Sequence, residues 1–190
     1  MAEHSGVLVC GEVVEGKLAS ITAELLGSAR SLAGKLNEKV SAVLIGSGVA
    51  GAAKEAAAFG ADKVYVADDA ALKDYQTDAF TTVLASLVKE ANPRYILIGQ
   101  TSAGRDLAPR LAFRLGAVLT TDCIALDVDQ QTKGLLQTKP VYGGNARAIF
   151  TSSSFPQLAT VRQKAMTALQ PDPSRQAEVV NVPVKLDPAI

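Results

Sequence analysis

The chain has 190 residues, 48% of them hydrophobic and 20% charged, and its 19 Lys and Arg residues balance its 19 Asp and Glu residues. This composition supports a globular core, and a neutral chain without a Lys/Arg run is not typical of nucleic-acid-binding proteins. No apolar run reaches the roughly 20 residues needed to span a bilayer, and the first six residues lack the pattern of a signal peptide. We therefore expect a soluble, cytoplasmic protein.

Apolar runs and helix-period stretches alternate along the first two thirds of the chain. Short apolar runs typical of strands lie at Val7–Cys10, Val40–Ile45, Lys63–Ala67, Tyr95–Ile98 and Val118–Ala125. Apolar residues recur at helical spacing over Leu18–Leu36, Ala52–Phe59, Asp78–Ala91 and Leu107–Leu115. Strands that are apolar on both faces are typical of parallel sheets covered by helices. The alternation predicts a three-layer α/β domain with a parallel sheet and right-handed crossovers.

The pattern changes after Asp127. Stretches rich in β-forming residues lie at Gly134–Thr138, Val141–Tyr142, Ala146–Thr151 and Gln157–Arg162. With a Gly-Gly-Asn turn between two of them, they predict an antiparallel extension of the sheet. The Pro-Asp-Pro-Ser stretch at Pro171–Ser174 resembles a linker, and Val179–Leu186 is expected to form one last strand.

A dinucleotide-type motif follows the second expected strand. Gly46, Gly48 and Gly51 form a GxGxxG pattern, and Asp68 ends the next strand. Such a pattern can bind a pyrophosphate at a helix start, with the carboxylate on the ribose. The helix behind it is short and does not follow the first strand, and glycines at a strand-to-helix turn need no ligand. We favour a structural turn.

A second candidate for ligand binding follows the fourth strand. Gly99, Gln100, Thr101, Ser102, Gly104 and Arg105 lie between that strand and a helix expected to begin near Asp106. Hydroxyls, free helix amides and an arginine could hold an anion there. The alternative is an ordinary capped helix with Arg105 at the surface or at a subunit contact.

Side chains for catalysis are sparse. Asp68, Asp69, Asp106 and Asp122 are scattered, and Arg147 and Arg162 are expected to be solvated or to lie at an interface. Cys10 and Cys123 are far apart and are expected to be buried, and the single His4 lies in an N-terminus expected to be loose. This set gives no metal site, disulfide framework or Ser-His triad.

Five sequence segments together carry a family resemblance. They are GADKVYVAD (Gly60–Asp68), GQTSAGRDLAPRLA (Gly99–Ala112), TTDC (Thr120–Cys123), VYGGNARA (Val141–Ala148) and ATVRQKAM (Ala159–Met166). In this order they resemble the N-terminal domain of the electron transfer flavoprotein alpha subunit, and the resemblance covers essentially the whole chain. It implies a fold of adenine-nucleotide-alpha-hydrolase (HUP) type, in agreement with the α/β pattern.

The resemblance also implies a function. The family's alpha subunit forms a heterodimer with a beta subunit and carries electrons through FAD between flavin dehydrogenases, such as the acyl-CoA dehydrogenases of fatty acid beta-oxidation, and downstream acceptors. It is an electron carrier and not an enzyme. FAD is expected mainly on a C-terminal domain that this sequence lacks, and AMP is a possible ligand of the partner subunit. Residues 1–170 would form the N-terminal domain, and 171–190 a linker toward the missing domain.

Three functions compete at this point. The first is the electron-transfer subunit, in which this domain is a scaffold for the beta subunit. The second is a stand-alone adenine-nucleotide-binding module of HUP type, with its ligand at the strand ends. The third is an NAD-dependent enzyme using Gly46–Gly51 and Asp68, and it lacks an identifiable base. In the first two, Gly99–Arg105 is the best place for a bound anion.

Overall fold

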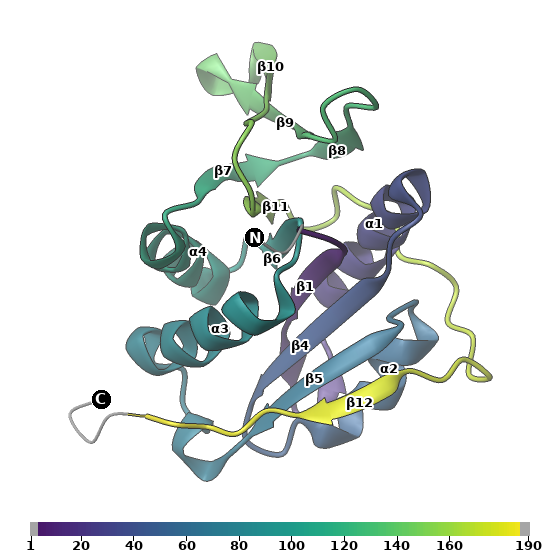
Figure 1. Ribbon diagram of the computed structural model, residues 1–190, viewed down its shortest axis with the longest axis vertical. Coiled ribbons are helices and arrows are strands. Elements are labelled where there is room, and N and C mark those ends of the chain that lie inside the picture. Colours follow the sequence, from purple (N-terminus) through teal and green to yellow (C-terminus); the bar gives the residue numbers. More distant parts are fainter. Residues whose placement is uncertain (1–3, 187–190) are drawn as a thin grey trace.

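A computed structural model describes residues 4–186, and its centre is a seven-stranded parallel sheet (Figure 1). The strand order is β12-β5-β4-β1-β6-β11-β7, and every neighbouring pair is parallel. The strands are β1 (Val7–Gly11), β4 (Val40–Gly46), β5 (Lys63–Asp68), β6 (Tyr95–Gly99), β7 (Val118–Cys123), β11 (Gln157–Val161) and β12 (Glu178–Asn181). The expected α/β class is confirmed.

Two helices cover each face of this sheet. They are α1 (Ser20–Leu36) and α2 (Ala53–Ala58) on one face, and α3 (Thr77–Ala91) and α4 (Ser102–Leu115) on the other. Strand β1 shows why the apolar runs do not alternate with polar residues: Val7 and Val9 pack toward α1, while Leu8 and Cys10 pack toward α3 and α4. All four side chains are buried, as expected for a strand covered on both faces.

The remaining short elements lie outside the main sheet. They are the hairpin β2 (Val13–Val14) and β3 (Lys17–Leu18), the 3₁₀ turns η1 (Ala50–Ala52), η2 (Ala70–Leu72) and η3 (Tyr142–Gly144), and the strands β8 (Ala125–Val128), β9 (Leu135–Val141) and β10 (Ala146–Phe150). The last three form an antiparallel sheet in the order β10-β9-β8. This is the expected antiparallel extension.

The prediction for Gln157–Arg162 was wrong in one respect. This segment forms β11, which lies inside the main sheet between β6 and β7 and runs parallel to both. All five residues of β11 are buried, as expected for an inner strand that has a neighbouring strand on each side and is covered on both faces. The expected strand Val118–Ala125 is also interrupted: β7 ends at Cys123, and the backbone of Asp122 has a positive φ of 61°.

The fourth main helix begins earlier than predicted. α4 starts at Ser102 instead of near Asp106, because Thr101 is its N-cap and accepts a hydrogen bond from the Gly104 N–H at 3.0 Å. A threonine alone is a weak sequence signal for a helix N-cap. The first turn of α4 also consists of small residues without a helical apolar pattern, so the sequence did not predict it. Within α4 the apolar face of Leu107 and Leu111 packs on the sheet as expected.

Both ends of the described chain are held by the main sheet. His4 Nδ1 lies 3.0 Å from the carbonyl oxygen of Pro93, so this residue is not loose as expected. At the other end, β12 pairs with β5 and becomes an edge strand of the same sheet. Residues 171–177 form no helix or strand, in keeping with the linker-like composition. A domain division at residue 170 stays a prediction.

Candidate functional site

The carboxyl ends of β1 and β6 form the point where the sheet topology reverses. β1 leads through α1 to β4 on one side, while β6 leads through α4 to β7 on the other. Loops at such a point separate and leave a crevice, which is where open α/β sheets bind their ligands. Glu12 follows β1, Gly99 ends β6, and Gln100 and Thr101 follow it, so these residues lie at the ends of the two strands that border the crevice.

Glu12 is the carboxylate of this crevice. Its Oε1 accepts a hydrogen bond from the Thr101 hydroxyl at 2.7 Å, so the start of α4 is tied to the end of β1. Partial burial raises the pKa of Glu12, although the bond from Thr101 acts in the opposite direction. Our sequence analysis missed Glu12, and the only available signal was its position directly after the Gly that ends the first strand.

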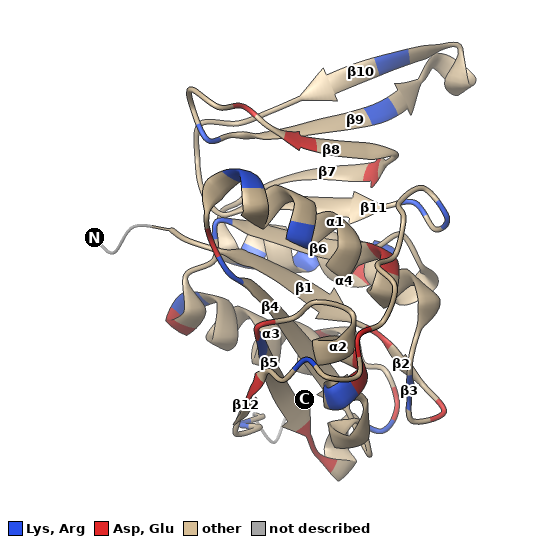
Figure 2. Cartoon of the chain, turned by 90° about the vertical axis from the view of Figure 1, so that its right-hand side faces the viewer, with Lys and Arg blue, Asp and Glu red and all other residues tan. Residues whose placement is uncertain are grey.

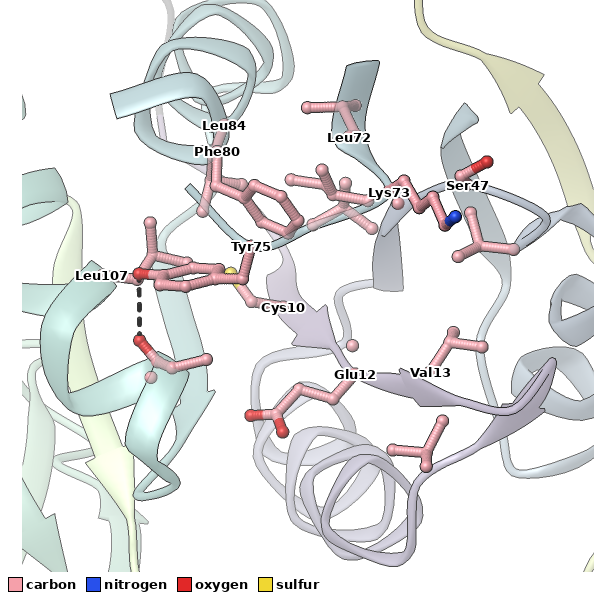
Figure 3. A pocket seen from close by; sticks show the side chains of 18 of the residues that line it. Cys10, Glu12, Val13, Ser47, Leu72, Lys73, Tyr75, Phe80, Leu84 and Leu107 are labelled. Atoms are coloured by element: carbon pink, nitrogen blue, oxygen red, sulfur yellow. Dashed lines mark hydrogen bonds between the residues drawn. The ribbon is translucent and has the colours of Figure 1, made fainter. Parts of the chain in front are cut away.

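A cavity of about 410 Å³ opens beside Glu12. Figure 3 shows Tyr75, Phe80, Leu84 and Leu107 on one side of it, with Glu12 and Val13 below and Lys73 and Ser47 at the opposite end. The hydroxyl of Tyr75 donates to Asp106 Oδ2 at 3.0 Å and lies 3.3 Å from the carbonyl oxygen of Ala103. The cavity therefore combines apolar and polar side chains, with the Glu12 carboxylate at the topological reversal, Glu15 also in the lining, and Lys73 at its edge.

The fold itself uses four of the six residues predicted to bind an anion. Gly99 and Gly104 allow the close approach of β6 and α4, because a Cβ on Gly104 would lie 1.9 Å from the Gly99 carbonyl oxygen. Gln100 accepts a hydrogen bond from the Thr160 hydroxyl, and Thr101 caps α4. The two remaining residues, Ser102 and Arg105, are exposed. Anion binding here stays a prediction, and it depends chiefly on these two side chains.

The GxGxxG turn is satisfied by its own chain. Asp68 Oδ1 accepts from the Gly48 N–H at 2.7 Å, and Asp68 Oδ2 accepts from the Ala50 N–H at 3.0 Å. Backbone amides that could bind a pyrophosphate are thus already paired with an internal carboxylate. The helix that follows, α2, has only six residues. This geometry supports the structural interpretation of Gly46–Gly51.

Three of the segments that carry the family resemblance meet at the ends of β6, β11 and β7. Arg162 donates from two nitrogens to Asp122, at 2.9 and 2.6 Å, and the Asp122 N–H donates to the Thr160 hydroxyl at 2.9 Å. The hydrogen bonds from Arg162 hold the pKa of Asp122 below its usual value. Arg162 is exposed, as expected, and it also makes a two-pronged ion pair that joins the end of β11 to β7.

Neither Cys10 nor Cys123 forms a disulfide bond within the part of the chain that the structure describes. Both are free and buried, as expected, and burial raises the pKa of the Cys123 thiol to about 12. Within residues 4–186, no group of three His, Cys, Asp or Glu side chains is placed to hold a metal ion. None of the helices in that range combines the length and the apolar character needed to cross a membrane.

Comparison with known proteins gives one consistent result. The family description "Electron transfer flavoprotein domain" matches residues 7–187. The electron transfer flavoprotein subunit alpha of Megasphaera elsdenii is 42% identical over 190 residues, which is 100% of this chain and 56% of the relative. Protein FixB of Clostridium saccharobutylicum is 42% identical over 98% of this chain and 55% of its own length.

A further relative is named for a different reaction. Subunit LctC of a lactate dehydrogenase (NAD(+),ferredoxin) of Acetobacterium woodii is 39% identical over 87% of this chain and 40% of its own length. The chain thus spans about half the length of these curated relatives. These relatives are all similar to this chain in sequence, while their names point to more than one metabolic role.

Proposed function

The chain belongs to the electron transfer flavoprotein family, and from this premise we propose that it is the N-terminal half of an alpha-type subunit that carries electrons. The observation that carries the proposal is 42% identity to an alpha subunit over every residue of the chain. The meeting of three family segments at the ends of β6, β11 and β7 supports it, because those segments stabilise one edge of the scaffold.

FAD is the cofactor we propose for the complete subunit. The cavity beside β1 does not favour a flavin dinucleotide, because a diphosphate is attracted by cations and free amides, while the two carboxylates that line the cavity, Glu12 and Glu15, outnumber its one lysine, Lys73. Two amides of the Gly46–Gly51 turn, those of Gly48 and Ala50, also donate to Asp68 already. We therefore place FAD mainly on the half of the subunit that lies outside this sequence, and we assign these residues a scaffold role.

The partners follow from the same proposal. We propose a heterodimer with a beta subunit, in the cytoplasm, that accepts electrons from flavin dehydrogenases such as acyl-CoA dehydrogenases and passes them to a further acceptor. In this arrangement the subunit is a carrier and not an enzyme. The name of the LctC relative points to a different donor, lactate, so the dehydrogenase is the least constrained part of the proposal.

The cavity favours one alternative function, a stand-alone module that binds an adenine nucleotide of AMP or ATP type. Its position at the topological reversal and its volume of about 410 Å³ are typical of small-ligand sites. Against this alternative, the Glu12 carboxylate stands at the reversal, where it would repel a phosphate.

Calorimetric titration separates the two functions. The purified chain is titrated with AMP, ATP, NAD and FAD, and the gene product isolated from its own cells is examined for bound flavin and a second chain. We expect no binding to the isolated chain, and a yellow two-subunit complex from the cells. Micromolar binding of AMP or ATP together with a colourless single-chain product would replace our proposal with the nucleotide-binding module.

A further inference from the structure

The cavity at the end of β1 has one wall made of apolar side chains. Phe80 and Leu84 of α3 and Leu107 of α4 form this wall together with the ring of Tyr75 (Figure 3). The rings of Tyr75 and Phe80 contact each other edge to face, with their centroids 5.0 Å apart. The Tyr75 hydroxyl donates to Asp106, so the ring is held in place at the wall. A wall of this kind fits the apolar body of a small molecule.

The main sheet supplies another part of the lining, on the side of the molecule seen edge-on in Figure 2. Cys10 of β1 pairs with Val43 of β4 on one side and with Ile98 of β6 on the other, so their side chains form a row across the sheet. All three line the cavity, and all three are more than nine-tenths buried. Side chains packed this tightly keep their positions, so this part of the cavity is preformed and does not depend on a loop movement.

Glu12 lines this cavity without a cation beside it. The side chain is half-buried, and its Oε1 accepts the hydrogen bond from Thr101. Within residues 4–186, no Lys or Arg forms an ion pair with Glu12, and no hydrogen bond reaches its Oε2. Burial without a counter-charge raises the pKa of this carboxyl group. Carboxylates taken partly out of water are normally paired with a cation, so Glu12 offers an unused acceptor to a cationic ligand.

The rest of the lining does not reverse this preference. Glu15 adds a second carboxylate, and Figure 3 shows Lys73 at the end of the cavity opposite Glu12. Glu15 and Lys73 are both exposed, so water screens their charges, and the half-buried Glu12 sets the sign of the potential nearby. At the start of α4, the Gly104 N–H already donates to Thr101, which leaves fewer amides for an anion.

We propose that this cavity binds a small organic cation, with a primary ammonium group on an apolar or aromatic body. The ammonium group would donate to Glu12, and the body would lie on the wall formed by Phe80 and Leu107. This ligand site adds to the scaffold role and does not depend on electron transfer, since every residue that it uses belongs to this chain. It differs from the nucleotide-binding alternative in the sign of the ligand's charge.

Three probes of similar size and different charge test the proposal. They are phenethylamine, phenethyl alcohol and hydrocinnamate, which at neutral pH are a cation, a neutral molecule and an anion. Each is titrated into the purified chain while the isoleucine methyl groups are followed by NMR. Ile45 and Ile98 line the cavity, and the exposed Ile149 on β10 is the internal control. We expect saturable shifts of Ile45 and Ile98 with phenethylamine, about tenfold weaker binding of the alcohol, and no shifts with hydrocinnamate.

Two substitutions assign the charge preference to Glu12. Glu12→Gln keeps an oxygen that can accept from Thr101 but removes the charge, so phenethylamine should bind about tenfold more weakly while the affinity for the alcohol is unchanged. Glu90→Gln is the matched control, because Glu90 is an exposed carboxylate near the C-terminal end of α3 and does not line the cavity. This control should bind phenethylamine within about twofold of wild type.

Three results would each overturn the inference. They are unshifted Ile45 and Ile98 methyl groups at high phenethylamine concentration, hydrocinnamate binding as tightly as the amine, and equal amine affinity in wild type and Glu12→Gln. All three leave the electron-carrier proposal standing, because they concern only the cavity. Saturable shifts of the same methyl groups with AMP at micromolar concentration would overturn the inference and favour the nucleotide-binding module instead.

Discussion

Glu12 is a carboxylate that the fold holds partly out of water. Burial raises its pKa, so the folded state binds the proton of Glu12 more tightly than the unfolded state does. The sign follows from linkage: stability is lost as the pH rises from the unfolded pKa through the folded pKa, and it stays lower above that range. A side chain held at such a cost, at the topological reversal of the sheet, points to a role in positioning α4 or in excluding anions.

Removing this charge should therefore stabilise the protein at neutral pH. Glu12→Gln keeps an oxygen that can accept the hydrogen bond from Thr101, but it has no charge to desolvate. We expect a higher free energy of unfolding than wild type at pH 7, and a difference that shrinks below pH 4, where the unfolded wild-type carboxyl is also protonated. Urea titrations at several pH values measure this, and an equal difference at all pH values would contradict the account.

At the scale of secondary structure, the close approach of α4 to β6 depends on one missing methyl group. A Cβ on Gly104 would lie 1.9 Å from the Gly99 carbonyl oxygen and 3.1 Å from the Ile98 side chain. Neither the strand backbone nor the capped helix start can move without breaking the bonds made by Thr101. Gly104→Ala should cost about 3 kcal/mol of unfolding free energy, at the upper end of what overpacking usually costs.

The matched control for this substitution lies in η1. Gly51 is exposed, has no positive φ, and has nothing within 4 Å of the position of an added Cβ. Gly51→Ala should therefore stay within about 1 kcal/mol of wild type, on the stabilising side, because alanine restricts the unfolded chain. Chemical denaturation of both variants measures the two unfolding free energies. Similar unfolding free energies for the two would mean that α4 and β6 can separate freely.

The local sequence pattern was sufficient to predict most helices and strands. It was insufficient for the pairing of strands that lie far apart in the sequence. The runs at Tyr95–Ile98 and Val40–Ile45 became β6 and β4 because a strand buried on both faces needs only apolar residues. β11 has the same character, but its alternating neighbours led to the prediction that it belongs to the antiparallel extension. Its insertion between β6 and β7 depends on contacts some 40 to 60 residues away, such as Thr160 with Gln100 and with Asp122, which periodicity does not encode.

The site was predicted only in outline. The carboxyl edge of the sheet follows from strand direction, and the segment Gly99–Arg105 lies at the end of β6. Of its six predicted site residues only Gly104 lines the cavity, and anion binding there stays a prediction. The parts that sequence reasoning missed, Glu12 and Tyr75, reach the crevice through the β1 and η2 loops, whose course no local rule determines. The spacing of the Gly46–Gly51 turn resembles a nucleotide motif, but the sequence already favoured a structural turn. The hydrogen bonds that Asp68 accepts from the Gly48 and Ala50 N–H groups support that interpretation.

At the scale of the whole molecule, the chain is a parallel-sheet scaffold with an antiparallel extension. The acid-free stretch 130–171 supplies β9, β10 and β11, so one sequence segment forms most of the extension and also a strand inside the main sheet. The acidic residues lie in the rest of the chain.

The central claim is that this chain is part of an electron carrier, and anaerobic flavin spectroscopy tests it most directly. The complete subunit with its beta partner is mixed with a catalytic amount of an acyl-CoA dehydrogenase and its acyl-CoA substrate, and the flavin absorbance near 450 nm is followed. We predict bleaching that depends on both the dehydrogenase and its substrate. A flavin that stays oxidised with acyl-CoA and lactate dehydrogenases alike, or a complex without flavin, would contradict the account.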